Sequence, residues 1–178
     1  MLLPQTISQH TELNTSGSQV FAINLSAPFI PGFGKGEGHT FLSEIVPFCD
    51  IIIGNEAEAA SWASANKLPA EAKLEVIAKA LATQPKANSS RPRLVIFTHG
   101  AESTIVVSSA EPDSPKVYPV NKVGHIVDTN GAGDAFAGGF LGAFVAGKNI
   151  DESVEAGHKL GAMCVQQVRF QVALSCQT

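Results

Sequence analysis

Residues 127–141 read VDTNGAGDAFAGGFL, a polar turn that leads into a run of small and apolar residues. The pair Ile126–Val127 predicts a short strand before the turn, and the apolar run predicts a helix after it. Two glycines that bracket an alanine leave the start of this helix without obstructing side chains. Bare backbone N–H groups at a helix start, reinforced by the positive end of the helix dipole, suit a phosphate or a developing anion. The stretch therefore predicts an anion-binding loop at Gly131, Ala132 and Gly133.

Asp134 falls in the first turn of this predicted helix. The helix dipole favours its ionised form, so that a carboxylate beside the anion loop can accept a proton from an attacking hydroxyl. An acidic side chain near a helix start is also a common cap, and glycines commonly serve turns. A Gly-Ala-Gly-Asp string by itself therefore leaves a structural and a catalytic interpretation open.

The composition favours a single globular domain in the cytoplasm, with the nucleus also possible. The chain has 178 residues, of which 44% are hydrophobic, and a formal net charge of −4. It contains no basic run with interleaved aromatics, which argues against a nucleic-acid partner. Its apolar runs are too short to span a membrane, and its start does not resemble a signal peptide. The scattered Cys49, Cys164 and Cys176 predict reduced thiols, not a disulfide framework or a zinc site.

Apolar periodicity along the chain predicts an α/β fold with a mainly parallel sheet. The expected strands are residues 20–25, 50–54 and 93–98, followed by an antiparallel pair at 104–108 and 117–120. Helices are expected at residues 40–48 and 71–83, and a last helix is expected to open at Asp151. Gly147 is expected to end the preceding helix in the left-handed conformation. The glycines of the last helix are expected to permit close packing, with His158 off the packed face.

Polar and aromatic residues follow the expected strands at their carboxyl ends, where open α/β sheets place ligands. Phe29 follows the first strand and can stack on a base, although an aromatic residue there is more commonly part of the core. Asn55 and Glu58 follow the second strand with the spacing of a capping box, which requires no ligand. The segment 98–100, Thr-His-Gly, follows the third strand.

Five motifs occur in an order that resembles the ribokinase-like (phosphofructokinase-B type) family of sugar and nucleoside kinases. They are NLSAPF at 24–29, GNEAEA at 54–59, VIFTHG at 95–100, DTNGAGDAF at 128–136 and AGH at 156–158. Asn130 and the NLSAPF string resemble the members that phosphorylate adenosine. The resemblance implies a three-layer α/β domain. Along the chain, we expect a polar lead-in at residues 1–19, the ribokinase-like nucleotide-binding portion at 20–168 and a divergent tail at 169–178. It covers the second half of a typical member, so the family's N-terminal half and lid are expected to be absent.

The resemblance also implies transfer of the ATP γ-phosphoryl group to the 5′-hydroxyl of adenosine, with Mg²⁺. Asp134 is then the catalytic base, and Gly131, Ala132 and Gly133 offer amides to the phosphoryl group. The implied ATP contacts are Asn55, Thr98, His99, Gly100 and His158, the nucleoside contacts are Phe29 and Asn130, and Glu58 holds the metal indirectly through water. His99 departs from the glutamine expected at its position.

Two rival functions remain at the level of sequence, namely a non-catalytic nucleotide-binding module and a ribokinase-like sugar kinase. ATP binding without phosphorylation of adenosine would favour the first. Product analysis with adenosine, inosine and ribose as acceptors would distinguish a sugar kinase from an enzyme that phosphorylates adenosine. Without a lid, the 178-residue chain is expected to phosphorylate adenosine weakly or not at all. It is also expected to self-associate through an exposed edge of the strand at 20–25.

Overall fold

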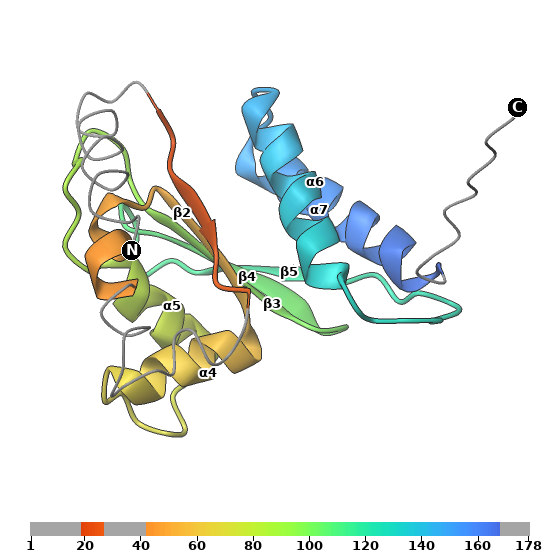
Figure 1. Ribbon diagram of the computed structural model, residues 1–178, viewed down its shortest axis with the longest axis horizontal. Coiled ribbons are helices and arrows are strands. Elements are labelled where there is room, and N and C mark those ends of the chain that lie inside the picture. Colours follow the sequence, from red (N-terminus) through yellow and green to blue (C-terminus); the bar gives the residue numbers. More distant parts are fainter. Residues whose placement is uncertain (1–18, 27–41, 168–178) are drawn as a thin grey trace, which may run out of the picture. The chain divides into compact units, whose positions relative to one another are not determined.

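The computed structural model describes residues 19–26 and 42–167 (Figure 1). The chain divides into two compact units, Met1–Pro119 and Val120–Thr178. The predicted segment 20–168 therefore spans parts of both units. No helix within the described ranges is both long enough and apolar enough to cross a membrane.

The first unit is built on a five-stranded sheet in the order β1-β2-β3-β4-β5. Its strands are β1 (Ala22–Asn24), β2 (Ile51–Asn55), β3 (Leu94–His99), β4 (Ser103–Ser108) and β5 (Lys116–Pro119). β1, β2 and β3 are parallel, whereas β4 and β5 continue the sheet in antiparallel pairing. The predicted strands and the antiparallel extension are thus confirmed, with boundaries shifted by at most two residues. β1 and β5 are the edges of the sheet as described.

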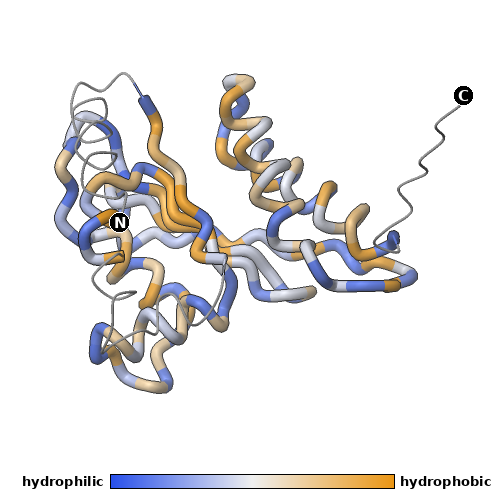
Figure 2. Tube along the Cα trace, in the orientation of Figure 1, coloured by the Kyte–Doolittle hydropathy of each residue, from blue (hydrophilic) through white to orange (hydrophobic). Residues whose placement is uncertain are grey.

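Helical segments of the first unit pack on the sheet through their apolar positions. Residues 42–45 are helical and continue into η1 (Val46–Phe48), and the longer helices are α4 (Glu56–Ala65) and α5 (Leu74–Ala82). Ile77, Ala78 and Leu81 lie on one face of α5 and are buried, as their spacing predicts. Figure 2 shows the resulting apolar centre, where the hydrophobic strands run through the middle of this unit.

Both faces of the central strands are buried. Val95, Phe97 and Val107 belong to the cluster that contains residues of α4 and α5. The alternate positions Ile53 and Ile96 are also buried, with exposed fractions of 2% and 0%. Near-continuous apolar strands of this kind occur in sheets that are covered on both faces.

Arg93 ties the amino ends of β2 and β3 to the ends of the helices. Its side chain is fully buried, and its guanidinium group donates to six backbone carbonyl oxygens. These belong to Val46, Cys49, Leu81, Ala82, Gln84 and Pro85, at 2.7–3.3 Å. The planar fork of donors adds hydrogen bonds to carbonyls at and just beyond the helix ends. Burial raises the pKa of the neighbouring Cys49 thiol to about 12, which keeps it protonated.

The second unit contains α6 (Ala132–Val145) and α7 (Ile150–Val165), which pack together closely at glycines. A Cβ atom at Gly139 would lie 2.6 Å from the Ala156 carbonyl oxygen, and one at Gly157 would lie 2.8 Å from the Phe136 ring. The expectation that glycines permit close helix packing is therefore confirmed. The close packing requires that both positions lack a side chain.

The turn between α6 and α7 follows from its sequence, with one correction. Gly147 has φ +81°, and the amides of Gly147 and Lys148 donate to carbonyls of the last turn of α6, as predicted for a left-handed helix end. The last helix begins at Ile150 and not at Asp151. The reason is that Asn149 forms the cap, in reciprocal hydrogen bonds with Glu152.

The predicted strand at Ile126–Val127 is wrong. These residues adopt no strand conformation, and both side chains are exposed. The amides of Val127 and Asp128 instead donate to the carbonyl oxygen of Val165, at 2.8 and 3.3 Å. The last turn of α7 has an unpaired carbonyl available there, so it takes the place of a neighbouring strand.

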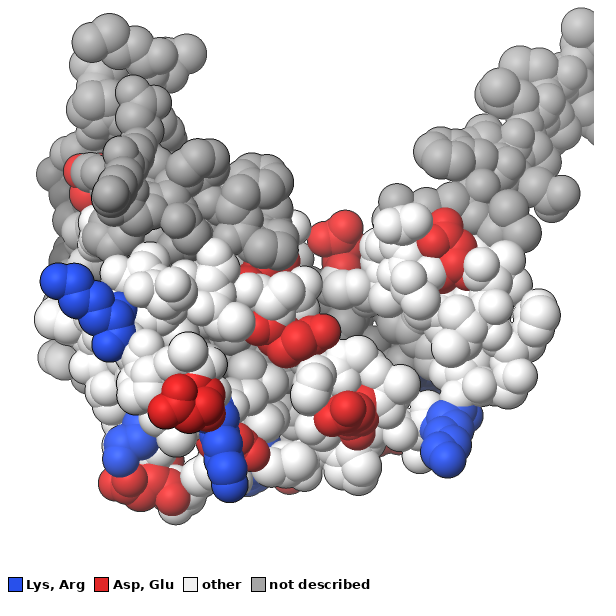
Figure 3. All heavy atoms as spheres, turned by 90° about the horizontal axis from the view of Figure 1, so that it is seen from below, with Lys and Arg blue, Asp and Glu red and all other residues white. Residues whose placement is uncertain are grey.

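Charged side chains of both signs are interspersed on the face shown in Figure 3. Among the described residues, exposed ion pairs include Lys79 with Asp113 and Lys148 with Glu152. Pairs this exposed add little to stability. By contrast, the pair of Lys86 and Asp50 is nearly buried, at 2.7 Å.

Candidate functional site

The predicted anion loop forms the start of α6. Gly131 occupies the N-cap position with φ +76°, a left-handed conformation that glycine adopts without steric cost. No side chain caps the helix at this position. The amides of the first turn thus lack the side-chain acceptor that most helices provide, and they retain the positive end of the dipole.

Gly133 has open space in the direction that a side chain would take. A Cβ atom built at this position meets no atom within 4 Å, so packing among the described residues does not require glycine there. Glycine is useful at such a position when a ligand must approach the backbone closely. The sequence prediction of an anion loop is therefore compatible with the local geometry.

Asp134 is the third residue of α6 and is exposed, as its place in the first turn predicts. Asn130, also exposed, directly precedes the N-cap. Its backbone amide and its Nδ2 both donate to Oδ1 of Asp128, at 2.9 Å each. The structure thus brings Asn130, Gly131, Ala132, Gly133 and Asp134 together in one turn.

His158 belongs to the same unit and lies closer to the helix packing than predicted. Its ring is 5.6 Å from the Phe136 ring, at an angle of 46°, and is half-buried. The prediction that His158 falls off the packed face is wrong, because the absence of a side chain at Gly157 lets Phe136 reach α7 beside it. Burial lowers the pKa of His158 below its ordinary value of 6.5.

The other predicted contacts gather at the carboxyl edge of the sheet in the first unit. Asn55 and Thr98 are direct partners in the parallel pairing of β2 with β3. The Thr98 hydroxyl donates to the Gly54 carbonyl oxygen at 3.4 Å. The strand ends therefore meet where open α/β sheets bind ligands.

Glu58 is buried, with an exposed fraction of 3%, and forms the predicted capping box with Asn55. Its two carboxylate oxygens accept from the Asn55 backbone amide at 3.0 Å and from Asn55 Nδ2 at 3.2 Å. A Cβ atom at Gly54 would lie 2.9 Å from Glu58 Oε2, so a glycine is needed where the carboxylate folds back over β2. The cap is confirmed, whereas the metal role remains a prediction.

His99 ends β3, and Gly100 begins the turn that leads into β4. Gly100 has φ +50°, and the amide of Glu102 donates to the His99 carbonyl oxygen at 2.9 Å. His99 Nδ1 lies 3.1 Å from Glu102 Oε2, and the side chain of His99 is 42% exposed. The imidazole is therefore oriented by a carboxylate of its own turn.

Phe29 lies outside the described residues. Within the described ranges, no three His, Cys, Asp or Glu side chains come together as a metal site. Carboxylates that act on Mg²⁺ through water or together with substrate phosphates need no such cluster. The two groups of predicted residues belong to different units, with Asn55, Glu58 and 98–100 in the first and 130–134 and His158 in the second.

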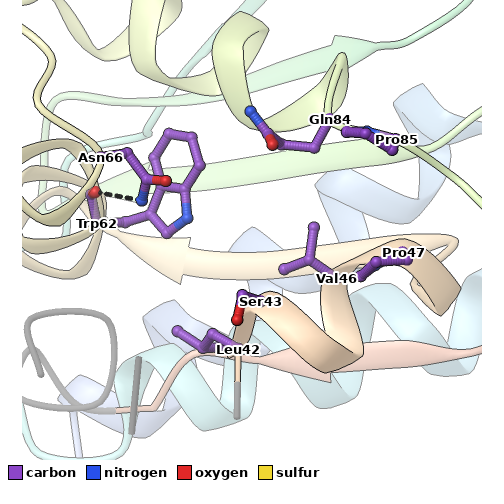
Figure 4. Close-up of a pocket in the computed structure, with 8 residues that line it drawn as sticks. All are labelled: Leu42, Ser43, Val46, Pro47, Trp62, Asn66, Gln84 and Pro85. Carbon is purple, nitrogen blue, oxygen red and sulfur yellow. Dashed lines mark hydrogen bonds between the residues drawn. The ribbon is translucent and has the colours of Figure 1, made fainter. Parts of the chain in front are cut away.

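A pocket of about 200 Å³ lies elsewhere in the first unit (Figure 4). Its lining residues come from the segment before β2, from α4 and from the segment after α5: Leu42, Ser43, Val46, Pro47, Trp62, Asn66, Gln84 and Pro85. Asn66 Nδ2 donates to the Trp62 carbonyl oxygen at 2.9 Å across one wall. The segments before β2 and after α5 lead into the amino ends of β2 and β3, and Trp62 and Asn66 lie toward the end of α4 that is remote from β2. The pocket is therefore not part of the carboxyl edge.

Two residues of the site were not singled out from the sequence. Asp128 was noted only as part of a motif, although an Asp two residues before Asn in a turn is typical of a side chain that accepts from the backbone. Gly54, at the end of β2, makes room for the Glu58 carboxylate, and a glycine at a strand end is a known signal of close approach.

Three known proteins illustrate what the chain is similar to. Adenosine kinase from Schizophyllum commune is 56% identical over 153 residues, which are 85% of this chain and 43% of that protein. The structure of Anopheles gambiae adenosine kinase in complex with P1,P4-di(adenosine-5) tetraphosphate has a TM-score of 0.83 at 34% identity, over 93% of this chain and 47% of that one. The structure of adenosine kinase from Schistosoma mansoni in complex with 2-fluoroadenosine has a TM-score of 0.80 at 29% identity, over 91% of this chain and 47% of that one.

The chain spans about half the length of the relatives that it matches. Their likeness confirms the predicted ribokinase-like α/β fold. The model of the pfkB family of carbohydrate kinases matches residues 3–175, which is nearly the whole chain. The chain belongs to the pfkB carbohydrate kinase family.

Proposed function

We propose that the chain forms the ATP-binding and phosphoryl-transfer part of an enzyme that phosphorylates the 5′-hydroxyl of adenosine to give AMP. The observation that carries the proposal is the start of α6, where Gly131 adopts the left-handed conformation, a Cβ atom at Gly133 would meet nothing within 4 Å and Asp134 is exposed. The likeness to three adenosine kinases supports adenosine as the acceptor.

In the proposed reaction the amides of the first turn of α6 stabilise the negative charge of the phosphoryl group during transfer. Asp134 accepts the proton of the 5′-hydroxyl as the bond from oxygen to the γ-phosphorus forms. The bond between the γ-phosphorus and the bridging oxygen breaks, and ADP leaves with that oxygen. Such chemistry depends mainly on positioning and charge stabilisation, so no covalent intermediate on the protein is needed.

The remaining residues have binding roles in this proposal. Thr98, His99 and Gly100 contact ATP from the carboxyl edge of the sheet, with Asn55 beside them, and His158 borders the base from α7. Asn130 and Phe29 contact the nucleoside.

Mg²⁺ neutralises the phosphate charge when it is bound. In the proposal Glu58 acts on it through water, from the position in which its carboxylate caps α4.

A phosphorylation assay tests the function. The chain spans less than half of the Schizophyllum commune relative. The assay therefore uses a full-length chimera in which the matching segment of this chain replaces that of the relative. We expect the chimera to convert adenosine to AMP, with inosine and ribose as much poorer acceptors. ATP binding with no phosphorylation of any acceptor would contradict catalysis, and preferred phosphorylation of ribose would contradict adenosine as the substrate.

A further inference from the structure

The pocket shown in Figure 4, called the Trp62 pocket below, contains a polar group without a protein partner. Trp62 lines it with an exposed fraction of only 5%. Within the described ranges, no hydrogen bond joins the indole Nε1 to another residue, and no fully buried side-chain nitrogen lacks a partner. Nε1 therefore keeps some accessible surface. In Figure 4 the ring edge that carries it points toward the wall formed by Val46 and Pro47. Because a buried tryptophan N–H normally has a partner, the pocket offers this donor to a bound molecule.

The walls of the Trp62 pocket are held from behind by Arg93. Its guanidinium group donates to the carbonyl oxygens of Val46, Gln84 and Pro85, at 2.7–3.0 Å. These residues line the pocket from two segments, one before β2 and one after α5. The walls are thus anchored before a ligand binds, which lowers the entropic cost of binding. The same hydrogen bonds occupy the carbonyls, so the polar chemistry of the pocket belongs mainly to side chains.

Two amide side chains complete this polar chemistry. Asn66 Nδ2 donates to the Trp62 carbonyl oxygen at 2.9 Å, and Gln84 Nε2 donates to the Ala80 carbonyl oxygen at 3.2 Å. Each bond orients its amide, which retains its oxygen and a second hydrogen. The described residues that line the pocket include no charged side chain. The pocket therefore suits an uncharged molecule that both donates and accepts hydrogen bonds.

The size and walls of the pocket restrict this molecule further. Its volume is about 200 Å³. Sites for drug-sized ligands are larger, at about 300–1,000 Å³, whereas an engineered cavity of about 150 Å³ in another protein holds benzene. A ligand of one or two rings therefore fits. Leu42, Val46 and the two prolines at 47 and 85 supply apolar surface for the faces of such a ring.

We propose that the Trp62 pocket binds a small uncharged nitrogen heterocycle of one or two rings, with a ring nitrogen that accepts a hydrogen bond from Trp62 Nε1. The site is separate from the proposed site of phosphoryl transfer, because it lies away from the carboxyl edge of the sheet. It is built only from residues of the first unit, and it does not rest on the proposed function.

Trp62 reports directly on the pocket, because it is the only tryptophan of the chain. In the ¹⁵N-labelled 178-residue chain its side-chain N–H gives a single NMR resonance, which is followed during titration with benzimidazole or indole. Both probes are flat two-ring molecules with one N–H, but only benzimidazole has an acceptor nitrogen. We expect benzimidazole to shift the Trp62 resonance with a Kd of about 1 mM or below, and indole to bind about fivefold more weakly. A Trp62 resonance that moves with neither probe overturns the site, and equal or tighter binding of indole overturns the contact with Nε1.

Trp62→Phe keeps an aromatic wall but removes the donor. In this variant, binding is followed by the NMR signals of the probes, and we expect benzimidazole to bind about fivefold more weakly than to the unchanged chain and no better than indole. An unchanged preference for benzimidazole in Trp62→Phe would contradict the proposed hydrogen bond.

Ser43→Phe tests the site without touching the core. Ser43 is exposed and lines the pocket, so a phenylalanine ring there should fill the space and abolish the shift of the Trp62 resonance. Glu44→Phe places the same ring at the next exposed position, which does not line the pocket, and this variant should bind benzimidazole as the unchanged chain does. Full binding by Ser43→Phe, or an equal loss in both variants, would overturn the proposal.

Discussion

Glu58 combines a structural position with a proposed catalytic one. Its carboxylate is buried and caps α4, so Glu58→Gln should lower the free energy of unfolding by about 1 kcal/mol. In the chimera, the same change should raise the Mg²⁺ concentration that gives half-maximal activity more than it raises KM for adenosine. Activity measured over a series of Mg²⁺ concentrations checks this.

The second capping box provides a matched control. Asn149 and Glu152 repeat the same reciprocal hydrogen bonds at the start of α7. Glu152→Gln should therefore weaken a cap while leaving the Mg²⁺ dependence unchanged. If both variants shift the Mg²⁺ dependence equally, Glu58 is only a cap.

His158 makes the stability of the chain depend on pH. Burial lowers its pKa in the folded state below the ordinary value of 6.5, so the unfolded state binds a proton more readily. The stability that His158 contributes is fully present above about pH 6.5 and is lost as the pH falls through the lower folded pKa. Thermal unfolding between pH 7 and 5 should show a smaller decrease in Tm for His158→Gln than for the unchanged chain. His125→Gln is the control. Because His125 is exposed, the Tm of this variant should decrease between pH 7 and 5 as much as the Tm of the unchanged chain.

At the scale of elements, the contact of α6 with α7 depends on glycine at position 157. Gly157→Ala would place a methyl group 2.8 Å from the Phe136 ring and 3.0 Å from its carbonyl oxygen. We expect a loss of about 1–3 kcal/mol in the free energy of unfolding, because the helices must move apart. Denaturant unfolding measures this loss.

Gly142→Ala is the control for this change. Gly142 lies in α6, and a Cβ atom there meets nothing within 4 Å. Alanine is a better helix former, so this variant should be as stable as the unchanged chain or more stable by up to about 1 kcal/mol. Equal destabilisation by both substitutions would contradict close packing at Gly157.

The elements differ in how far local sequence determines them. The parallel strands were predictable because runs such as residues 51–53 are apolar throughout, and the cap of α4 was predictable because its partners are three residues apart. The irregular conformation at Ile126–Val127 was not predictable, because the amides of Val127 and Asp128 donate to the distant carbonyl of Val165. In the site, the Gly131–Asp134 turn followed from its own sequence. The contact of His158 with Phe136 depends on how two helices pack.

At the scale of the molecule, Arg93 should be the main polar anchor of the first unit. Arg93→Met removes six hydrogen bonds from a fully buried side chain, and we expect a loss of at least about 3 kcal/mol in the free energy of unfolding. Lys79→Met removes an exposed partner of Asp113 and should cost less than about 1 kcal/mol. Denaturant unfolding of the two variants checks the difference. Similar losses would mean that the buried guanidinium group is no more important than a surface pair. The sequence did not reveal this role, because the six carbonyls lie 8 to 47 residues from Arg93.

The turnover of Asp134→Asn in the full-length chimera tests the central claim most directly. The substitution keeps the size of the side chain and the helix start, but it removes the proposed proton acceptor. We expect kcat with adenosine to fall by at least about 100-fold while the affinity for ATP stays nearly unchanged. A variant that turns over adenosine at a near-normal rate would contradict the assignment of Asp134 as the catalytic base.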